Sequence, residues 1–393
     1  MNPIKPFVFI FFLIPLACLQ AQGPVEAVLQ EIEKNNTTLA ALRSGVEAEK
    51  LGNRTGIFLA DPQVDLFLLN KSDENLRRTN FGLVQPLDIP TLLGRRNQLA
   101  QAMNQQLDYR YLEQRQQVLL EAHLLVIDLI YHNALALELE KRLQHASEIA
   151  RSYQAMLDAG EVNILEHNKA RLNLFNARKA LELNEIERRS LSNELQALNG
   201  GKAIAVDETE FPIAVLPPDF QEWVQGAFDA NPVFRSLEQE LVISRGEERL
   251  AKAAYWPEFS AGYMMEALPD ERFSGFGMGI SIPLWENRNT IRHARLKSIA
   301  IQQHNDDLSL RYLNHYRGLY DQAKALQESS QDNYRVISSF DNAALLIKAL
   351  NAGQISLIEY MLELGFYYDA VDLSLETERQ LQKVLARMER FAR

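Results

Sequence analysis

The sequence contains one unusual pattern twice, once in each half of the chain. Five positions of the first half recur in the second half at a constant offset of 195 residues, namely Asn36/Asn231, Leu42/Leu237, Pro62/Pro257, Phe81/Phe276 and Gly82/Gly277. Further on, residues 159–166 (AGEVNILE) are matched at an offset of 193 by residues 352–359 (AGQISLIE). Each half therefore predicts a helix, two short strands and very long helices, an order that cannot bury its apolar surface as one compact globule.

The long segments of the chain are free of helix breakers. Residues 95–159 and 161–199 contain neither Gly nor Pro. A continuous helix over 95–159 would be roughly 100 Å long at about 1.5 Å per residue. Helices of this length are typical of coiled coils and helical barrels rather than of ordinary globular domains.

The N-terminus has the features of a secretory signal peptide over residues 1–21. Lys5 precedes the apolar run Phe7–Leu19, and the bond after Ala21 is a candidate cleavage point. The single cysteine, Cys18, has two interpretations: removal with the signal peptide, or lipidation. Removal leaves no thiol, which suits an oxidising compartment outside the cytoplasm.

Charge and motifs exclude several classes of protein. The formal net charge is −11, which disfavours a nucleic-acid partner. The sequence has no phosphate-binding loop, no serine-hydrolase elbow and no zinc-protease helix, and no two of its seven histidines lie at i and i+4. We therefore expect no enzyme activity, no cofactor and no resident metal. Beyond the signal peptide no segment has 18 consecutive uncharged apolar residues, so any membrane-embedded part has to consist of strands.

Two short β segments are predicted in each half, over 62–70 and 80–88, and over 257–267 and 273–284. In the second half large apolar residues alternate with Gly, Ser and other small or polar residues, as in transmembrane β-strands with lipid on one face and a water-filled lumen on the other. The residues predicted to face lipid are Phe259, Tyr263, Phe276, Met278, Ile280 and Ile282. The alternative is a half-buried sheet edge in a soluble domain.

Four strands per chain cannot close a barrel, and a bilayer tolerates no open sheet edge because unpaired backbone groups are costly in hydrocarbon. Two copies would give eight strands and a filled interior, whereas three copies would give twelve strands and an open pore. The predicted fold is therefore mainly α with a transmembrane β-barrel: a trimeric 12-strand β-barrel continued by a 12-helix α-barrel of coiled-coil-like helices.

Two glycines mark the ends of long helices. Gly160 and Gly353 are predicted left-handed C-caps, and Asn163 and Ser356 are candidate N-caps of the returning helices. The chain then divides into a first repeat over 22–200, a connector over 201–220 and a second repeat over 221–393. The helical tips fall near residues 160 and 353.

The order of elements resembles that of the TolC-type outer-membrane efflux protein family, over about residues 24–390. The resemblance depends on the Asn231-Pro232 helix start, on the strand openings 61–64 (DPQV) and 256–259 (WPEF), on Gln85-Pro86, on 282–284 (IPL) and on the paired Ala-Gly turns. It implies a homotrimer in outer-membrane lipid with a periplasmic helical tunnel, a periplasmic adaptor protein and an inner-membrane pump of the RND type. The Asp-Pro opening and compact size are most similar to the heavy-metal efflux branch.

The resemblance also assigns roles to individual residues. Adaptor docking is expected at the helical tips, on Gly160, Glu161, Val162, Gly353, Gln354 and Ile355. An acidic entrance or gate is expected at Glu166, Glu359 and Glu363, where a ring of carboxylates would favour cations. The alternative for these glutamates is that they lie in first turns of helices and complement the helix dipole.

The sequence thus predicts the outer-membrane channel of a tripartite efflux system, a passive exit duct whose substrate, heavy-metal cations being one candidate, is chosen by the pump. The competing function is a periplasmic coiled-coil scaffold or adaptor without a membrane barrel. Labelling on the two faces of the predicted strands distinguishes these functions.

Overall fold

The computed structural model describes residues 24–70, 77–87, 90–285, 287–339 and 343–390. The predicted signal peptide, Cys18 and Asp88 lie outside these residues. In chain order the described elements are α1 Pro24–Asn35, α2 Thr37–Gly52, β1 Gln63–Asn70, β2 Arg77–Leu87, α3 Pro90–Asp158, α4 Ile164–Leu198, α5 Phe220–Ala230, α6 Pro232–Ala253, β3 Glu258–Ala267, β4 Arg272–Ser281, α7 Thr290–Ser339, α8 Ala343–Asn351 and α9 Leu357–Glu389.

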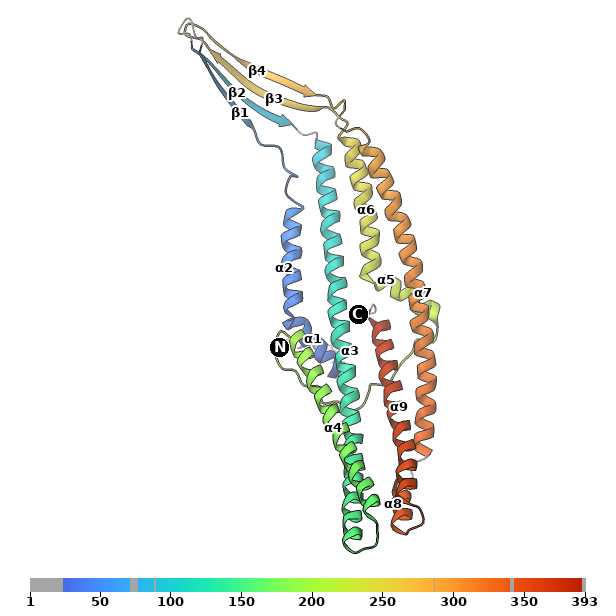
Figure 1. The fold of residues 1–393 in the computed structure, drawn as a ribbon. Coiled ribbons are helices and arrows are strands. Elements are labelled where there is room, and N and C mark those ends of the chain that lie inside the picture. The colour runs from blue at the N-terminus through green and yellow to red at the C-terminus, as the bar shows by residue number, and fades with distance from the viewer. Residues whose placement is uncertain (1–23, 71–76, 88–89, 286, 340–342, 391–393) are drawn as a thin grey trace, which may run out of the picture.

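The molecule is a long rod with its strands at one end (Figure 1). The 69-residue helix α3 runs from the sheet to the opposite end, where it turns into α4. The turn from α8 to α9 lies at that same end. The short helices α1 and α5 lie part-way along the rod, so sheet and helical tips are the two extremities of the molecule.

The duplicated sequence corresponds to a duplicated structure. The first repeat runs α1, α2, β1, β2, α3 and α4, and the second runs α5, α6, β3, β4, α7 with α8, and α9. Each repeat builds its own apolar cluster part-way along the rod. The first is formed by α1, α3 and α4 with Val206 of the connector, around the fully buried Ile32 and Leu195.

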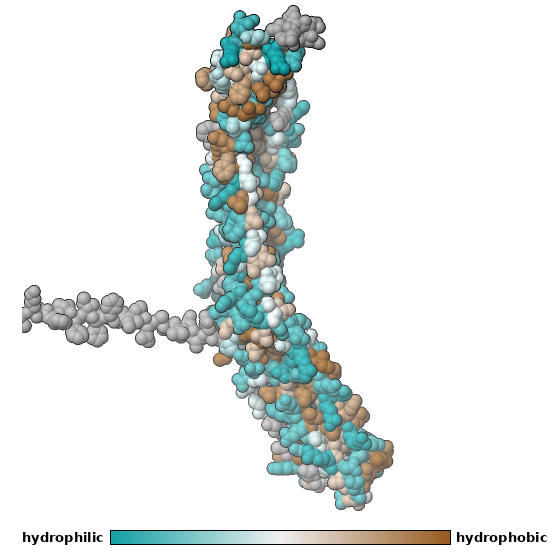
Figure 2. All heavy atoms as spheres, turned by 90° about the vertical axis from the view of Figure 1, so that its left-hand side faces the viewer, coloured by the Kyte–Doolittle hydropathy of each residue, from teal (hydrophilic) through white to brown (hydrophobic). Residues whose placement is uncertain are grey.

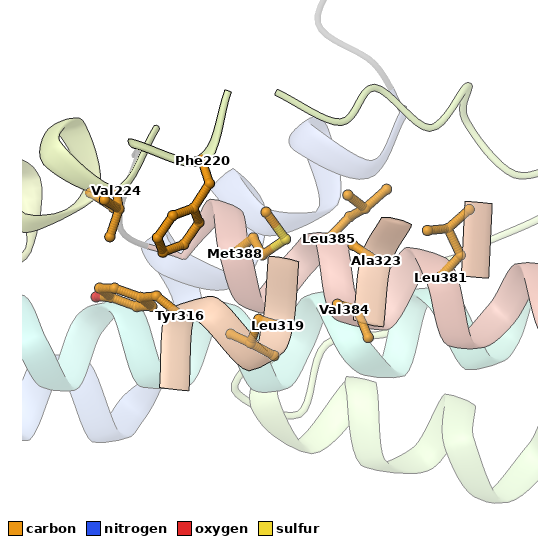
Figure 3. Close-up of a cluster of buried hydrophobic side chains, with 10 residues drawn as sticks. Phe220, Val224, Tyr316, Leu319, Ala323, Leu381, Val384, Leu385 and Met388 are labelled. Carbon is orange, nitrogen blue, oxygen red and sulfur yellow. The ribbon is translucent and has the colours of Figure 1, made fainter. Parts of the chain in front are cut away.

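The equivalent cluster of the second repeat lies between α5, α7 and α9 (Figure 3). Tyr316 of α7 is fully buried at its centre, facing Phe220 and Val224 of the short helix α5. Leu381, Val384, Leu385 and Met388 of α9 complete it. Both clusters bury apolar surface that a single long helix hairpin could not cover, so each fixes a short helix against the shaft.

A buried asparagine begins the second helix of each repeat. The Asn36 amide donates to the carbonyl oxygen of Leu198 at 2.8 Å, and the Asn231 amide donates to Tyr316 Oη at 2.8 Å. Each side-chain oxygen also accepts a hydrogen bond from a backbone N–H of the first helical turn. The predicted N-cap at Asn231, with Pro232 at the first helical position, is thereby confirmed.

The strands form one antiparallel sheet in the order β1-β2-β3-β4. The β2–β3 pair joins the two repeats, with Phe81 opposite Met265 and Leu83 opposite Tyr263. Each strand lies within a few residues of the predicted segment. The helix α2 ends at Gly52, and the chain then turns at Gly56, whose φ of +71° lies in the left-handed region.

One described helix, α3, includes a stretch within Leu92–Asp158 that is long and apolar enough, by composition alone, to cross a membrane. Its side chains Ala122, Val126 and Ile130 are almost fully buried against α1 and α4. Burial by neighbouring helices of the same chain is the property of a core helix, and the apolar composition of α3 is explained by that packing.

Candidate channel wall and helical tips

One face of the sheet is apolar from edge to edge. The register places Val64, Leu83, Tyr263 and Phe276 in one row across all four strands. Side chains alternate between the two faces of a strand, so the same face also carries Leu66, Leu68, Phe81, Leu87, Phe259, Met265, Met278 and Ile280. Phe276 is 92% exposed and Met278 is 95% exposed. Figure 2 shows apolar side chains gathered at the strand end of a largely hydrophilic rod.

The opposite face is dominated by small side chains toward the helices. Gly262 lies opposite Gly277, and Ser260 lies opposite Gly279. A Cβ atom on Gly262 would lie 2.8 Å from the carbonyl oxygen of Leu83, so this glycine is required by close backbone approach. The sheet therefore has one bulky apolar face and one face that leaves space in front of it.

The predicted lipid-facing residues fall on the apolar face with one exception. Phe259, Tyr263, Phe276, Met278 and Ile280 share that face. Ile282 lies beyond β4, which ends at Ser281. The prediction of a strand extending to 284 was wrong, because the β3–β4 ladder ends at the pair of Glu258 and Ser281, where β3 begins. Ile282 is nevertheless 59% exposed.

The sheet of a single chain is open. β1 and β4 are the outer strands, and each is paired on one side only among the described strands. Both carry exposed apolar side chains, including Leu68 at 70% and Met278 at 95% exposure. An exposed apolar edge strand favours pairing with another strand, so this sheet is built to be completed by further strands.

At the other end of the rod the two helical tips are built alike. Gly160 and Gly353 have φ of +75° and +65°, which confirms the predicted left-handed turns. Asn163 caps α4 and Ser356 caps α9 through their side chains, as predicted. Of the predicted docking residues, Glu161 and Gln354 are exposed, whereas Val162 and Ile355 pack against a shared apolar cluster around Tyr153, Ala170 and Tyr360. The two tips are thus held together.

The three predicted gate carboxylates differ in their surroundings. Glu359 accepts a hydrogen bond from the Ser356 backbone N–H at 2.7 Å, and the Ser356 hydroxyl accepts one from the Glu359 N–H. These backbone and side-chain hydrogen bonds lower the pKa of Glu359. Glu166 occupies the first turn of α4, and Glu363 is exposed one turn beyond Glu359. Glu359 is therefore part of a capping box.

Comparison with known proteins identifies solved structures of the same architecture. No protein-family model and no curated protein matches the sequence. The outer-membrane channel OprN has a TM-score of 0.76 at 16% identity, over 93% of this chain and 89% of that one. The CmeC outer membrane channel of Campylobacter jejuni has a TM-score of 0.74 at 13% identity, over 93% and 84%. CusC has a TM-score of 0.74 at 16% identity, over 93% and 91%.

The chain has the fold of TolC-type outer-membrane channels. The predicted fold class is confirmed as far as one chain extends, since the TolC-type fold combines long helices with a four-stranded sheet. The narrower assignment to a heavy-metal branch stays a prediction, because OprN and CmeC match this TolC-type fold as closely as CusC does.

Within the TolC-type fold, charged contacts tie α3 to α9, and these contacts were not predicted. Arg142 of α3 donates to both carboxylate oxygens of Asp372, at 2.9 Å and 2.6 Å. Its guanidinium carbon lies 4.4 Å from the ring centroid of Tyr368, which is 3.1 Å from His145 through its hydroxyl. Arg142 and Asp372 are 230 residues apart, so no local pattern could pair them.

No group of three side chains suited to hold a metal ion occurs in the part of the chain that the structure describes. His167, considered as a contact for passing cations, is buried on α4 beside Glu166. Neither of its ring nitrogens has a hydrogen-bond partner in the described residues.

Proposed function

We propose that this chain is an outer-membrane channel, a passive and non-enzymatic exit duct with its strands in the outer membrane and its helices in the periplasm. Three copies close a 12-strand barrel, and their helices form a 12-helix tunnel. The observation that carries the proposal is the open four-stranded sheet with an exposed face that carries large apolar side chains on all four strands. Lipid covers that face, and identical neighbours complete its edges.

The helices offer a second line of support. α4 carries apolar side chains that its own chain leaves exposed, at Leu165, Leu172, Phe175, Leu183 and Ile186. Leu165, Leu172 and Ile186 are separated by multiples of seven residues, the spacing of a coiled-coil seam. α9 has a similar stripe at Ile358, Leu362, Phe366 and Leu373. Neighbouring copies would bury both stripes as the tunnel closes.

The partners follow from the two ends of the rod. A periplasmic adaptor docks on the exposed tip residues Glu161 and Gln354, beside Gly160 and Gly353, and an inner-membrane pump of the RND type delivers the cargo. The pump selects the substrate, for which heavy-metal cations are one candidate, and the described residues of the duct hold no group of three side chains suited to bind a metal ion.

The carboxylates Glu166, Glu359 and Glu363 line the tunnel entrance in this proposal, up to nine per trimer, and favour cations. The capping role of Glu359 is compatible with that position, because its carboxylate stays ionised and solvent-exposed. The turns that precede α4 and α9 lie at the end of the rod away from the sheet, and in this proposal that end faces the pump.

Fractionation and conductance test the proposal. We expect the mature protein to be found with outer membranes as a heat-sensitive trimer on denaturing gels and to conduct ions in planar bilayers. A water-soluble monomer recovered from the periplasm without detergent would refute it. A heat-treated sample, run as a monomer and inactive in the bilayer, serves as the control.

The alternative, a periplasmic scaffold without a barrel, is distinguished by cysteine labelling at two adjacent strand positions. Met278 lies on the apolar face, and Gly277 lies on the opposite face. In a barrel wall, Met278→Cys would react with lipid-soluble reagents and Gly277→Cys would react with aqueous reagents. A soluble sheet would leave the highly exposed position 278 open to aqueous reagents instead.

A further inference from the structure

The spacious face of the sheet changes character along its length. Toward the helices it carries glycine and serine, as at Gly277 and Ser260. Near the turns that join the strands, at the end away from the helices, the same face carries Phe67 and Phe273. Each of these phenylalanines is 57% exposed. Neither is buried by its own chain, so packing within one copy does not account for them.

The two phenylalanines belong to one row of the sheet. Phe67 lies opposite Asn80, Asn80 lies opposite Glu266, and Glu266 lies opposite Phe273. Phe67 is on β1 and Phe273 is on β4, so the row begins and ends with phenylalanine at the two open edges. Its middle is polar and rigid.

Arg78 holds that polar middle in place. Its Nε donates to Glu266 Oε1 at 2.8 Å and to Asn80 Oδ1 at 3.3 Å, and it lies on the same face of the sheet. Met264, one row further in, adds another large side chain at 62% exposure. The outer part of this face is therefore bulky, with phenylalanines at its two edges and polar side chains between them, in contrast to the glycine-lined part.

We propose that Phe67 and Phe273 narrow the outer mouth of the lumen and restrict the passage of bulky hydrated solutes there. This inference rests on the proposed function, because only closure by three copies sets the β4 edge of one copy beside the β1 edge of the next. Each of the three contacts between copies then brings Phe273 of one copy near Phe67 of the next, so six phenylalanines surround the mouth of the barrel. Apolar constrictions of this kind hinder the entry of water and of hydrated solutes.

The test uses a single cysteine deeper in the lumen. Gly277 lies two rows further in on the same face, and a Cβ atom there would meet only Met264 Sδ at 3.8 Å, so Gly277→Cys is sterically tolerated. Whole cells are treated from outside with a small charged thiosulfonate or with a polymer-linked maleimide too large for general porins. The labelling rate is compared between Gly277→Cys alone and Gly277→Cys with Phe67→Ala and Phe273→Ala.

We expect the small reagent to label both proteins alike and the bulky reagent to label the protein without the two phenylalanines roughly tenfold faster. The matched control, Gly277→Cys with Phe276→Ala, removes a neighbouring phenylalanine from the apolar face and leaves both rates unchanged. Equal rates for the bulky reagent, whether fast or slow, in the presence and absence of Phe67 and Phe273 would overturn the constriction.

A failure of the channel itself gives a different result. Met278→Cys on the apolar face would then react with the small aqueous reagent as readily as Gly277→Cys does, or the protein would be recovered as a soluble monomer. Either outcome refutes the barrel before the phenylalanines are tested, so the two proposals fail separately.

Discussion

At the scale of single residues, Gly200 combines a left-handed backbone with a close approach to another part of the backbone. Its φ is +65°, and a Cβ atom there would collide with the backbone carbonyl oxygen of Asn35 at the start of the first repeat. Gly201 has a φ of +82° but open space around it. A comparison of substitutions at Gly200 and Gly201 therefore distinguishes the effect of backbone strain from that of steric collision.

We expect Gly200→Ala to lower the free energy of unfolding by about 2–4 kcal/mol, because both a left-handed backbone and a collision oppose the methyl group. Gly201→Ala is opposed only by the left-handed backbone, so we expect it to lower the free energy of unfolding by about 1–2 kcal/mol. Denaturant unfolding in detergent measures both. Equal losses would show that the Asn35 contact relaxes at no cost.

Glu359 caps α9 and is also one of the carboxylates proposed to line the tunnel entrance. Its pKa is lowered below the ordinary value of 4.5 by the hydrogen bonds of the capping box. A lowered pKa in the folded state means that the unfolded chain binds the proton first, so the stabilisation is complete at neutral pH and is lost as the pH falls through the folded pKa.

We therefore expect Glu359→Gln to be less stable than the wild type near neutral pH, with the difference disappearing as the pH falls through the lowered pKa of Glu359. The same substitution should reduce cation selectivity, measured as reversal potential in asymmetric salt. Ser356→Ala is the control, because it weakens the cap by about 0.5–2 kcal/mol but keeps the charge. A reversal potential unchanged by Glu359→Gln would remove this residue from the entrance.

At the scale of helices, the contact between Arg142 and Asp372 fixes α9 against α3. Arg142 is only 12% exposed at its side chain, and it donates to both oxygens of Asp372 while lying over Tyr368. Removal of the carboxylate leaves a largely buried guanidinium without its main acceptor. Such a loss is costlier than the loss of an exposed ion pair.

We expect Asp372→Ala to destabilise the folded protein by about 1–3 kcal/mol. Asp332→Ala breaks the exposed pair with Arg335 on α7, whose side chains are 69% and 73% exposed, and should change stability by less than about 0.5 kcal/mol. Thermal unfolding at matched detergent concentration compares the two. Similar effects would mean that the α3–α9 pair contributes no more than a surface contact.

At the scale of the whole molecule, association should depend on the uncovered stripe of α4. Phe175 is 55% exposed in the single chain, on the face opposite the buried Ala170 and Asn184. We expect Phe175→Asp to abolish the heat-sensitive trimer, because it would bury an unpaired charge at a helix seam. Lys169→Asp, an exposed position outside the stripe, should leave the trimer intact on native gels. Trimers that survive Phe175→Asp would show that this stripe is not the seam.

The duplicated pattern was sufficient to predict the helix-strand-strand-helix order, the left-handed turns at Gly160 and Gly353 and the two faces of the strands, because each depends on residues close together in the chain. The α3–α9 contacts depend on residues more than 200 positions apart, and a single sequence carries no signal for them. The phenylalanine row was missed for the same reason, since only the register of four strands shows that Phe67 and Phe273 lie at one level.

The hydrogen-bonded β2–β3 pair, which unites the two repeats within one polypeptide, has a consequence for assembly. If each repeat were a separate molecule, a ring of twelve strands would need six intermolecular encounters between strands, including the one that closes the ring. A covalent tether makes half of those encounters intramolecular, at an effective concentration that dilution cannot lower. Completion of the proposed ring then depends on three intermolecular encounters instead of six, which favours its formation at low protein concentration.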